Sequence, residues 1–107
     1  EMFANCTGLK TAPELPFKSN SSYNYGCYRG MFYNCTGLTT PPSSIPYLMH
    51  DYACYQMFYG CSKLTKTPTM SNCDCDQYAC YQMFYGCSKL TDASNITITS
   101  TYSYSNY

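Results

Sequence analysis

The sequence predicts a single solenoid domain of about four stacked repeats, each 26–29 residues long and containing short α- or 3-10-helical and β elements. Two observations predict it. The segment YACYQMFYGCSKLT occurs twice without a change, at 52–65 and 78–91, which is an offset of 26 residues. Weaker copies of the same pattern precede it in the same phase. Repetition at a fixed period of about 20 to 50 residues is typical of stacked architectures, in which neighbouring units share one core.

The template M-F-x-x-C-x-x-L defines the four units. A proline stands four residues after the leucine in the first three units, where the fourth unit has Ser94, and an apolar residue follows. The units span about 1–22, 23–50, 51–76 and 77–99, and a tail rich in serine and tyrosine occupies 100–107. The Met-Phe pairs begin at Met2, Met31, Met57 and Met83, and the later apolar residues are Leu15, Ile45, Met70 and Ile96.

Each unit is expected to begin with one or two helical turns and to continue as extended chain. Tyr55, Phe58 and Cys61 follow the i, i+3, i+6 spacing of a short helix. The threonine-rich segment after Leu64 favours extension, but the proline that follows limits any strand to a few residues. The alternating segment 96–99 predicts the strand of the fourth unit. The expected core residues are Phe32, Phe58, Phe84, Leu38 and Leu64.

Seven of the nine cysteines follow the repeat. On a helix, Cys54 and Cys61 would be about 10 Å apart along the axis, which is too far for a disulfide. Pairing within a unit would need a short or broken helix. We favour buried thiols that pack as small hydrophobic groups. The phased cysteines are Cys6, Cys35, Cys61 and Cys87 in the template, and Cys27, Cys54 and Cys80 upstream of it.

Composition excludes several classes of function. Charged residues make up 11% of the chain, with six cationic and six acidic side chains, so neither a basic surface for phosphates nor a nucleic-acid partner is expected. No run of about 18 apolar residues predicts a membrane span, and no signal peptide is recognisable. Fourteen tyrosines predict an amphipathic aromatic surface suited to binding. Because Glu1 directly precedes the first Met-Phe pair, we expect a processed or excised product.

The template, together with the apolar-Pro pairs Leu15-Pro16 and Ile45-Pro46, resembles BspA-like leucine-rich repeat proteins over nearly the whole chain. Methionine replaces the alanine of that family's motif, and the repeats are long for the class. The resemblance implies a leucine-rich-repeat-like solenoid with a buried cysteine, found on the surface of microbes, their parasites or phages, or secreted by them. It implies a role in adhesion or recognition and no catalytic residues.

Two local clusters were considered as chemical sites. His50 adjoins Asp51, but no nucleophile or third orienting group accompanies them, so a surface loop is the favoured interpretation and no enzyme is expected. The segment 73–76, with two cysteines and two aspartates, could hold a soft divalent cation. A single C-x-C is not the paired cluster of structural zinc sites, so a disulfide from Cys73 or Cys75 to Cys80 is favoured over a metal. No metal and no cofactor are expected.

Four sequons, at Asn5, Asn20, Asn34 and Asn95, are weak candidates for glycosylation. The first and third lie inside the repeat template, where asparagine more simply serves a turn.

Two functions follow from these patterns. The first is an extracellular or cell-surface recognition module that binds a protein or glycan ligand through an exposed row formed by Tyr33, Tyr59 and Tyr85. The alternative is a structural subunit that stacks head to tail into an extracellular filament, because open ends of a repeat array make contacts that do not close. The residues expected at the two ends are Met2, Phe3 and Leu9, and Ile96 and Ile98.

Overall fold

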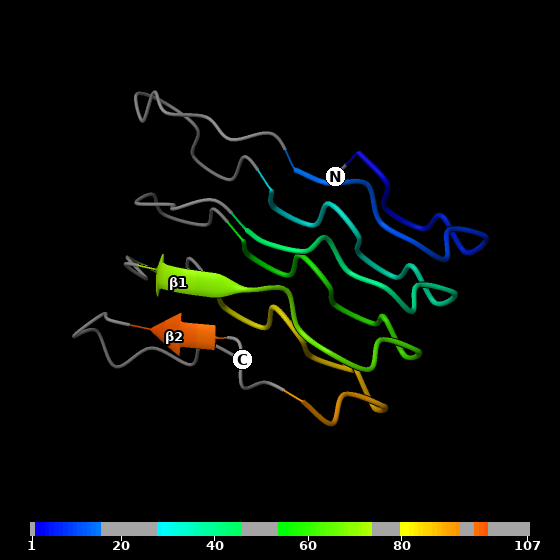
Figure 1. Ribbon diagram of the computed structural model, residues 1–107. Coiled ribbons are helices and arrows are strands. Elements are labelled where there is room, and N and C mark those ends of the chain that lie inside the picture. The colour runs from blue at the N-terminus through cyan, green and yellow to red at the C-terminus, as the bar shows by residue number, and fades with distance from the viewer. Residues whose placement is uncertain (1, 16–27, 46–53, 74–79, 93–95, 99–107) are drawn as a thin grey trace.

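The computed structural model describes residues 2–15, 28–45, 54–73, 80–92 and 96–98. Two strands lie within these ranges, β1 (Met70–Cys73) and β2 (Ile96–Ile98). They pair in parallel, with Met70 opposite Ile96, and the register shifts before Cys73 meets Ile98 (Figure 1). The strand at Ile96–Ile98 confirms the sequence prediction for that segment; Thr99 lies outside the described residues.

The helical turns expected at the start of the third unit are not found in the described residues, where 54–60 forms consecutive turns. Their absence has a backbone cause. Gln56 and Gly60 adopt φ of 52° and 76°, and a right-handed helix cannot pass through such residues. Gln82 and Gly86 repeat the arrangement in the next unit, with φ of 49° and 81°.

Backbone donors in the turns alternate between a local and a distant partner. The N–H groups of Met57, Tyr59 and Cys61 each donate to the carbonyl three residues earlier, at 3.0, 3.2 and 3.1 Å. The N–H groups between them donate instead to the next repeat. These bonds run from Gln56 to Tyr81, from Phe58 to Met83 and from Gly60 to Tyr85, at 3.0, 2.9 and 2.8 Å. The preceding turn repeats the pattern, with bonds from Gly30 to Tyr55, Phe32 to Met57 and Asn34 to Tyr59.

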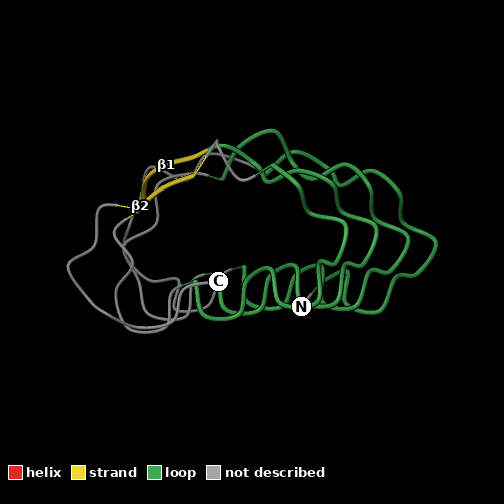
Figure 2. Cartoon of the chain, turned by 90° about the horizontal axis from the view of Figure 1, so that it is seen from below, coloured by secondary structure: helices red, strands yellow, loops and turns green. Residues whose placement is uncertain are grey.

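A column of phenylalanine rings runs through the core. Phe3, Phe32, Phe58 and Phe84 stack in order, with ring centroids 5.6, 5.4 and 5.5 Å apart. Phe32, Phe58, Leu38 and Leu64 are fully buried and Phe84 is 8% exposed, which confirms the predicted core. Figure 2 shows the turn segments along one edge of the molecule and the extended segments, with β1 and β2, along the other.

The extended segments pair less regularly than the turns. Isolated parallel bridges join Thr11 to Thr40, Ser44 to Thr69 and Lys66 to Asp92. Pro42 and Pro68 are fully buried in this region, and a proline has no N–H to donate to a ladder. The predicted limit on strand length therefore agrees with these short pairings.

We propose that these stacked repeats constitute a short solenoid of the leucine-rich-repeat type. Corresponding residues of successive units lie side by side in Figure 1. The backbone bonds and stacked rings recur at separations of 26 and 29 residues. A solenoid is the architecture in which each unit contacts its neighbours in this way.

Replacing Leu64 with alanine should lower the free energy of unfolding by about 2 to 5 kcal/mol, because a fully buried leucine leaves a cavity. Leu90 occupies the same slot in the fourth repeat but is only partly buried, so Leu90→Ala is a matched control with a smaller expected loss. Urea denaturation followed by circular dichroism would measure both variants. A loss below about 0.5 kcal/mol for Leu64→Ala would contradict the core assignment.

Candidate functional site

The predicted tyrosine row is present. Tyr33, Tyr59 and Tyr85, here called the first ladder, stack with ring centroids 4.8 and 5.1 Å apart. Tyr85 is 54% exposed, but Tyr33 and Tyr59 are half-buried. The predicted exposed row is therefore exposed only at Tyr85, while Tyr33 and Tyr59 are partly covered.

A second ladder was not predicted. The rings of Tyr55 and Tyr81 stack at 5.5 Å, and the guanidinium of Arg29 lies over Tyr55 at 4.9 Å from the ring centroid. Next to this ladder, the side-chain amide of Gln56 donates a hydrogen bond of 2.8 Å to Oε1 of Gln82. A sequence signal existed, because Arg29, Tyr55 and Tyr81 recur at intervals of 26 residues. The two ladders together form an aromatic and polar strip.

Three of the four template cysteines donate hydrogen bonds to the backbone of the neighbouring repeat. The Sγ atoms of Cys35, Cys61 and Cys87 donate to the carbonyls of Phe3, Phe32 and Phe58, at 3.0, 3.1 and 3.2 Å. Burial raises the pKa of Cys61 to about 12 and that of Cys87 to about 11, and it also raises the pKa of Cys35. These thiols are therefore protonated at neutral pH and are poor nucleophiles. The prediction that the phased cysteines are buried is confirmed for these three and for Cys54 and Cys80, whereas Cys6 is exposed.

The residues expected at the assembly ends differ in exposure. Met2 is 77% exposed, whereas its counterparts Met57 and Met83 are buried. Phe3 and Leu9 are partly buried against the core. At the other end, Ile96 and Ile98 lie in β2 and pair with β1 through the backbone.

The template asparagines are turn residues. Asn5 and Asn34 have φ of 63° and 56°, and they occupy the slot that glycine takes in the third and fourth repeats. Asparagine tolerates this left-handed conformation better than most residues. At Gly60 a second reason favours glycine, because an added Cβ would clash with Oδ1 of Asn34 unless that side chain moved. The interpretation of Asn5 and Asn34 as turn residues is confirmed.

Several predicted features lie outside the described residues. They are the His50-Asp51 pair, the acidic residues and second cysteine of 73–76, Asn20, Asn95 and the 100–107 tail. Cys73 is the last residue of β1. Within the described ranges, no group of three or more metal-ligating side chains is found, and no helix is long and apolar enough to cross a membrane.

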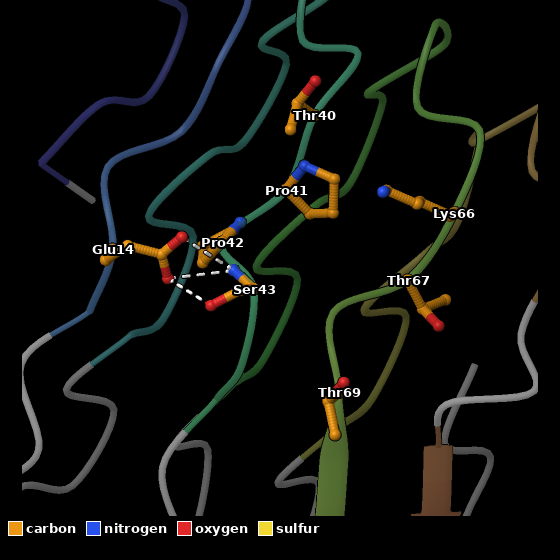
Figure 3. A pocket seen from close by; sticks show the side chains of 8 residues that line it. All are labelled: Glu14, Thr40, Pro41, Pro42, Ser43, Lys66, Thr67 and Thr69. Carbon is orange, nitrogen blue, oxygen red and sulfur yellow. Dashed lines mark hydrogen bonds between the residues drawn. The ribbon is translucent and has the colours of Figure 1, made fainter.

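A hollow of about 280 Å³ lies on the surface formed by the extended segments (Figure 3). It originates in one extra residue of the second repeat. Ser44 comes six positions after Leu38, whereas its bridge partner Thr69 comes five positions after Leu64. An extra residue opposite a regular partner makes the chain bulge. The residues lining the hollow are Glu14, Thr40, Pro41, Pro42, Ser43, Lys66, Thr67 and Thr69.

The hollow was missed, although its signal was present in the sequence. The spacing from the template leucine to the later apolar residue is six in the first, third and fourth repeats but seven in the second, from Leu38 to Ile45. A bulge could have been predicted from that one departure.

Opposite charges face the hollow from two repeats. The carboxylate of Glu14 accepts bonds from the backbone N–H of Ser43, at 3.0 and 3.2 Å to its two oxygens, and from the Ser43 hydroxyl at 2.7 Å. These bonds lower the pKa of Glu14, so it stays ionised at neutral pH. From the other side, Lys66 extends toward Pro41 (Figure 3). No ion pair joins Lys66 to Glu14 or to any other residue in the described part of the chain.

No family model, curated protein or solved structure matches this chain. The BspA-like resemblance is therefore carried by the repeat template alone.

The thiols should differ in reactivity according to their burial. With iodoacetamide at about pH 8, native protein should be alkylated first at Cys6, and at Cys61 and Cys87 only after denaturation, because buried thiols of raised pKa provide almost no thiolate. Peptide mass spectrometry would follow each site over time. Protein unfolded in guanidinium is the control, in which all three should react alike. Labelling of native Cys61 as fast as Cys6 would contradict the packing of the thiol column.

Proposed function

We propose that the chain is a non-enzymatic recognition module, extracellular or at a cell surface, that binds a protein or glycan ligand through its tyrosine ladders. The observation that carries this proposal is the first ladder, whose rings are 4.8 and 5.1 Å apart across three repeats. A regular array of amphipathic rings offers apolar edges together with hydroxyl groups for hydrogen bonding. Tyrosine is also among the residues enriched at binding hot spots.

The chemistry of the described residues supports binding rather than catalysis. The template thiols are used as hydrogen-bond donors within the core. The aromatic strip carries one cation, Arg29, which is engaged with the ring of Tyr55. A ligand that runs along the ladders would contact a tyrosine ring at each protein repeat. Such a surface suits an extended polymer whose own units recur at regular spacing.

We further propose that the chain belongs with BspA-like leucine-rich repeat proteins, as its template suggests. A buried cysteine in each inner repeat agrees with what that resemblance implies. The proposed extracellular or cell-surface location depends on this resemblance.

Replacing Tyr85 with alanine should weaken ligand binding about tenfold or more, because truncation of a hot-spot aromatic residue costs about 1 to 2 kcal/mol or more. Tyr85 is the exposed member of the first ladder, so its loss should leave the core intact. Biolayer interferometry would measure binding to an immobilised panel of acidic and neutral polysaccharides and of gelatin. Lys63→Ala, an exposed change outside both ladders, is the control.

If wild-type protein were retained by none of these probes, or if Tyr85→Ala were retained equally, recognition through the first ladder would be rejected.

A second candidate function, stacking onto a second copy, is favoured by the direction of the backbone bonds. Inner repeats donate from the Phe58 and Gly60 positions to the next repeat. In the fourth repeat, the N–H groups of Phe84 and Gly86 have no partner among the described residues. In the first repeat, no described donor reaches the carbonyls of Met2 and Ala4, which match the acceptors of the inner repeats. The two ends are thus complementary.

The stacking proposal predicts that the mass measured by light scattering rises with protein concentration. Met2→Lys should prevent that rise, because Met57 and Met83 in the same slot are buried and a lysine covered in that way would be desolvated. Thr7→Lys is the matched control, since Thr36 and Ser88 in the same slot are also exposed. A wild-type chain of constant monomer mass, or an equal effect of both lysines, would reject stacking.

A further inference from the structure

We propose that the hollow at the bulge of the second repeat binds an acidic pyranose, a uronic acid unit of a glycan, with its ring hydroxyls toward Glu14 and its carboxylate on Lys66. This inference rests on the proposed recognition function and specifies one ligand class for it. The site is distinct from the tyrosine ladders, because it lies on the extended segments and not on the turns (Figure 3).

The volume restricts the ligand to about one ring. The hollow measures about 280 Å³, and ligand pockets for drug-sized molecules begin at about 300 Å³. A single pyranose is therefore the appropriate size, while the open side of the hollow would let a glycan chain continue in both directions.

The polar groups of the hollow match those of a sugar acid. A carboxylate can accept about four hydrogen bonds, and Ser43 supplies three to Glu14, so the Glu14 oxygens can still accept one from a ligand hydroxyl. Lys66 offers ammonium donors that no described residue uses in an ion pair. Thr40 and Thr69 add exposed hydroxyls, which can both donate and accept. The arrangement needs a ligand with hydroxyls at one end and an anion at the other.

The spacing of the repeats favours a ligand longer than a free amino acid. The backbones at Glu14 and Lys66 lie two repeats apart, which is about 10 Å at strand spacing. An α-amino acid has only one carbon between its ammonium and its carboxylate, so it spans less of this width than a pyranose does. A uronic acid places hydroxyls and carboxylate on opposite sides of the ring, and hydrogen bonds of about 2.8 Å at each end extend its reach.

A peptide fits less well. A bound peptide gains much of its specificity from apolar side-chain pockets, yet six of the eight residues that line this hollow have polar or charged side chains, and the other two, Pro41 and Pro42, are buried. The hydroxyl groups of the lining favour a polyol instead. A dipeptide long enough to span both charges is nevertheless an informative competitor in the test.

The test is a titration of full-length protein with methyl β-D-glucuronide, followed by nitrogen-15 NMR chemical shifts. Methyl β-D-glucoside, which lacks the carboxylate, should bind at least about tenfold more weakly. Lys66→Gln should reduce glucuronide affinity at least about tenfold and leave the weak glucoside affinity unchanged. Lys63→Gln, which removes an exposed lysine outside the hollow, should have no effect. Glu14→Gln should weaken both sugars, because both use hydroxyls at that end.

Three results would overturn the inference: absence of glucuronide binding to wild type, equal affinity of the Lys66→Gln variant, or tighter binding of diglycine than of glucuronide. Each can be separated from failure of the proposed function. If a polysaccharide or gelatin probe is retained in a Tyr85-dependent way while glucuronide does not bind, recognition stands and the hollow is not its sugar site. Nearly superimposable amide spectra of wild type and Lys66→Gln in the absence of ligand would show that the variant is folded.

Discussion

The structure depends on one constraint, the sharing of backbone donors between a turn and the next repeat. Alternate N–H groups from Gln56 to Gly60 leave their own turn and bond to the following unit. The left-handed φ of Gln56 and Gly60 makes these inter-repeat bonds possible, because it turns every second peptide outward along the stack. In an α-helix the same N–H groups would bond to carbonyls within the helix. Cohesion between repeats is thus provided by the backbone, and it survives changes of side chain as long as the two turn positions tolerate positive φ.

The columns of side chains follow from that backbone spacing. Backbone bonds of about 2.9 Å hold successive turns close together. Equivalent side chains are therefore brought into contact, and the four phenylalanines and three tyrosines stack. The thiol of Cys61 completes the arrangement by donating to the carbonyl of Phe32 in the preceding repeat. Serine in place of cysteine would supply a bond but less apolar packing. Valine would remove the bond and leave the Phe32 carbonyl with the backbone N–H of Cys35 as its donor.

Much of this arrangement was predictable from periodicity, and the failures have physical reasons. Repeated apolar slots correctly identified Phe58 and Leu64 as core, and alternation identified the Ile96–Ile98 strand. The prediction of a helix was wrong because i, i+3 spacing also fits consecutive turns. The left-handed φ of Gln56 distinguishes the two structures, and a glutamine in the sequence does not predict that φ. The second ladder was overlooked because Arg29 interrupts the run of tyrosines.

The hollow illustrates how a repeat protein acquires an individual site. Perfect repetition gives every unit the same surface, so a site for one compact ligand requires a departure from the repeat. Here the departure is one residue in the Pro41–Ser43 segment, which separates the second repeat from the third and leaves Lys66 facing a space instead of a neighbour. Ser43 then fixes Glu14 at the opposite side. The repeats supply rigidity and the irregularity supplies specificity, so irregular spacings are where ligand sites should be sought in chains of this kind.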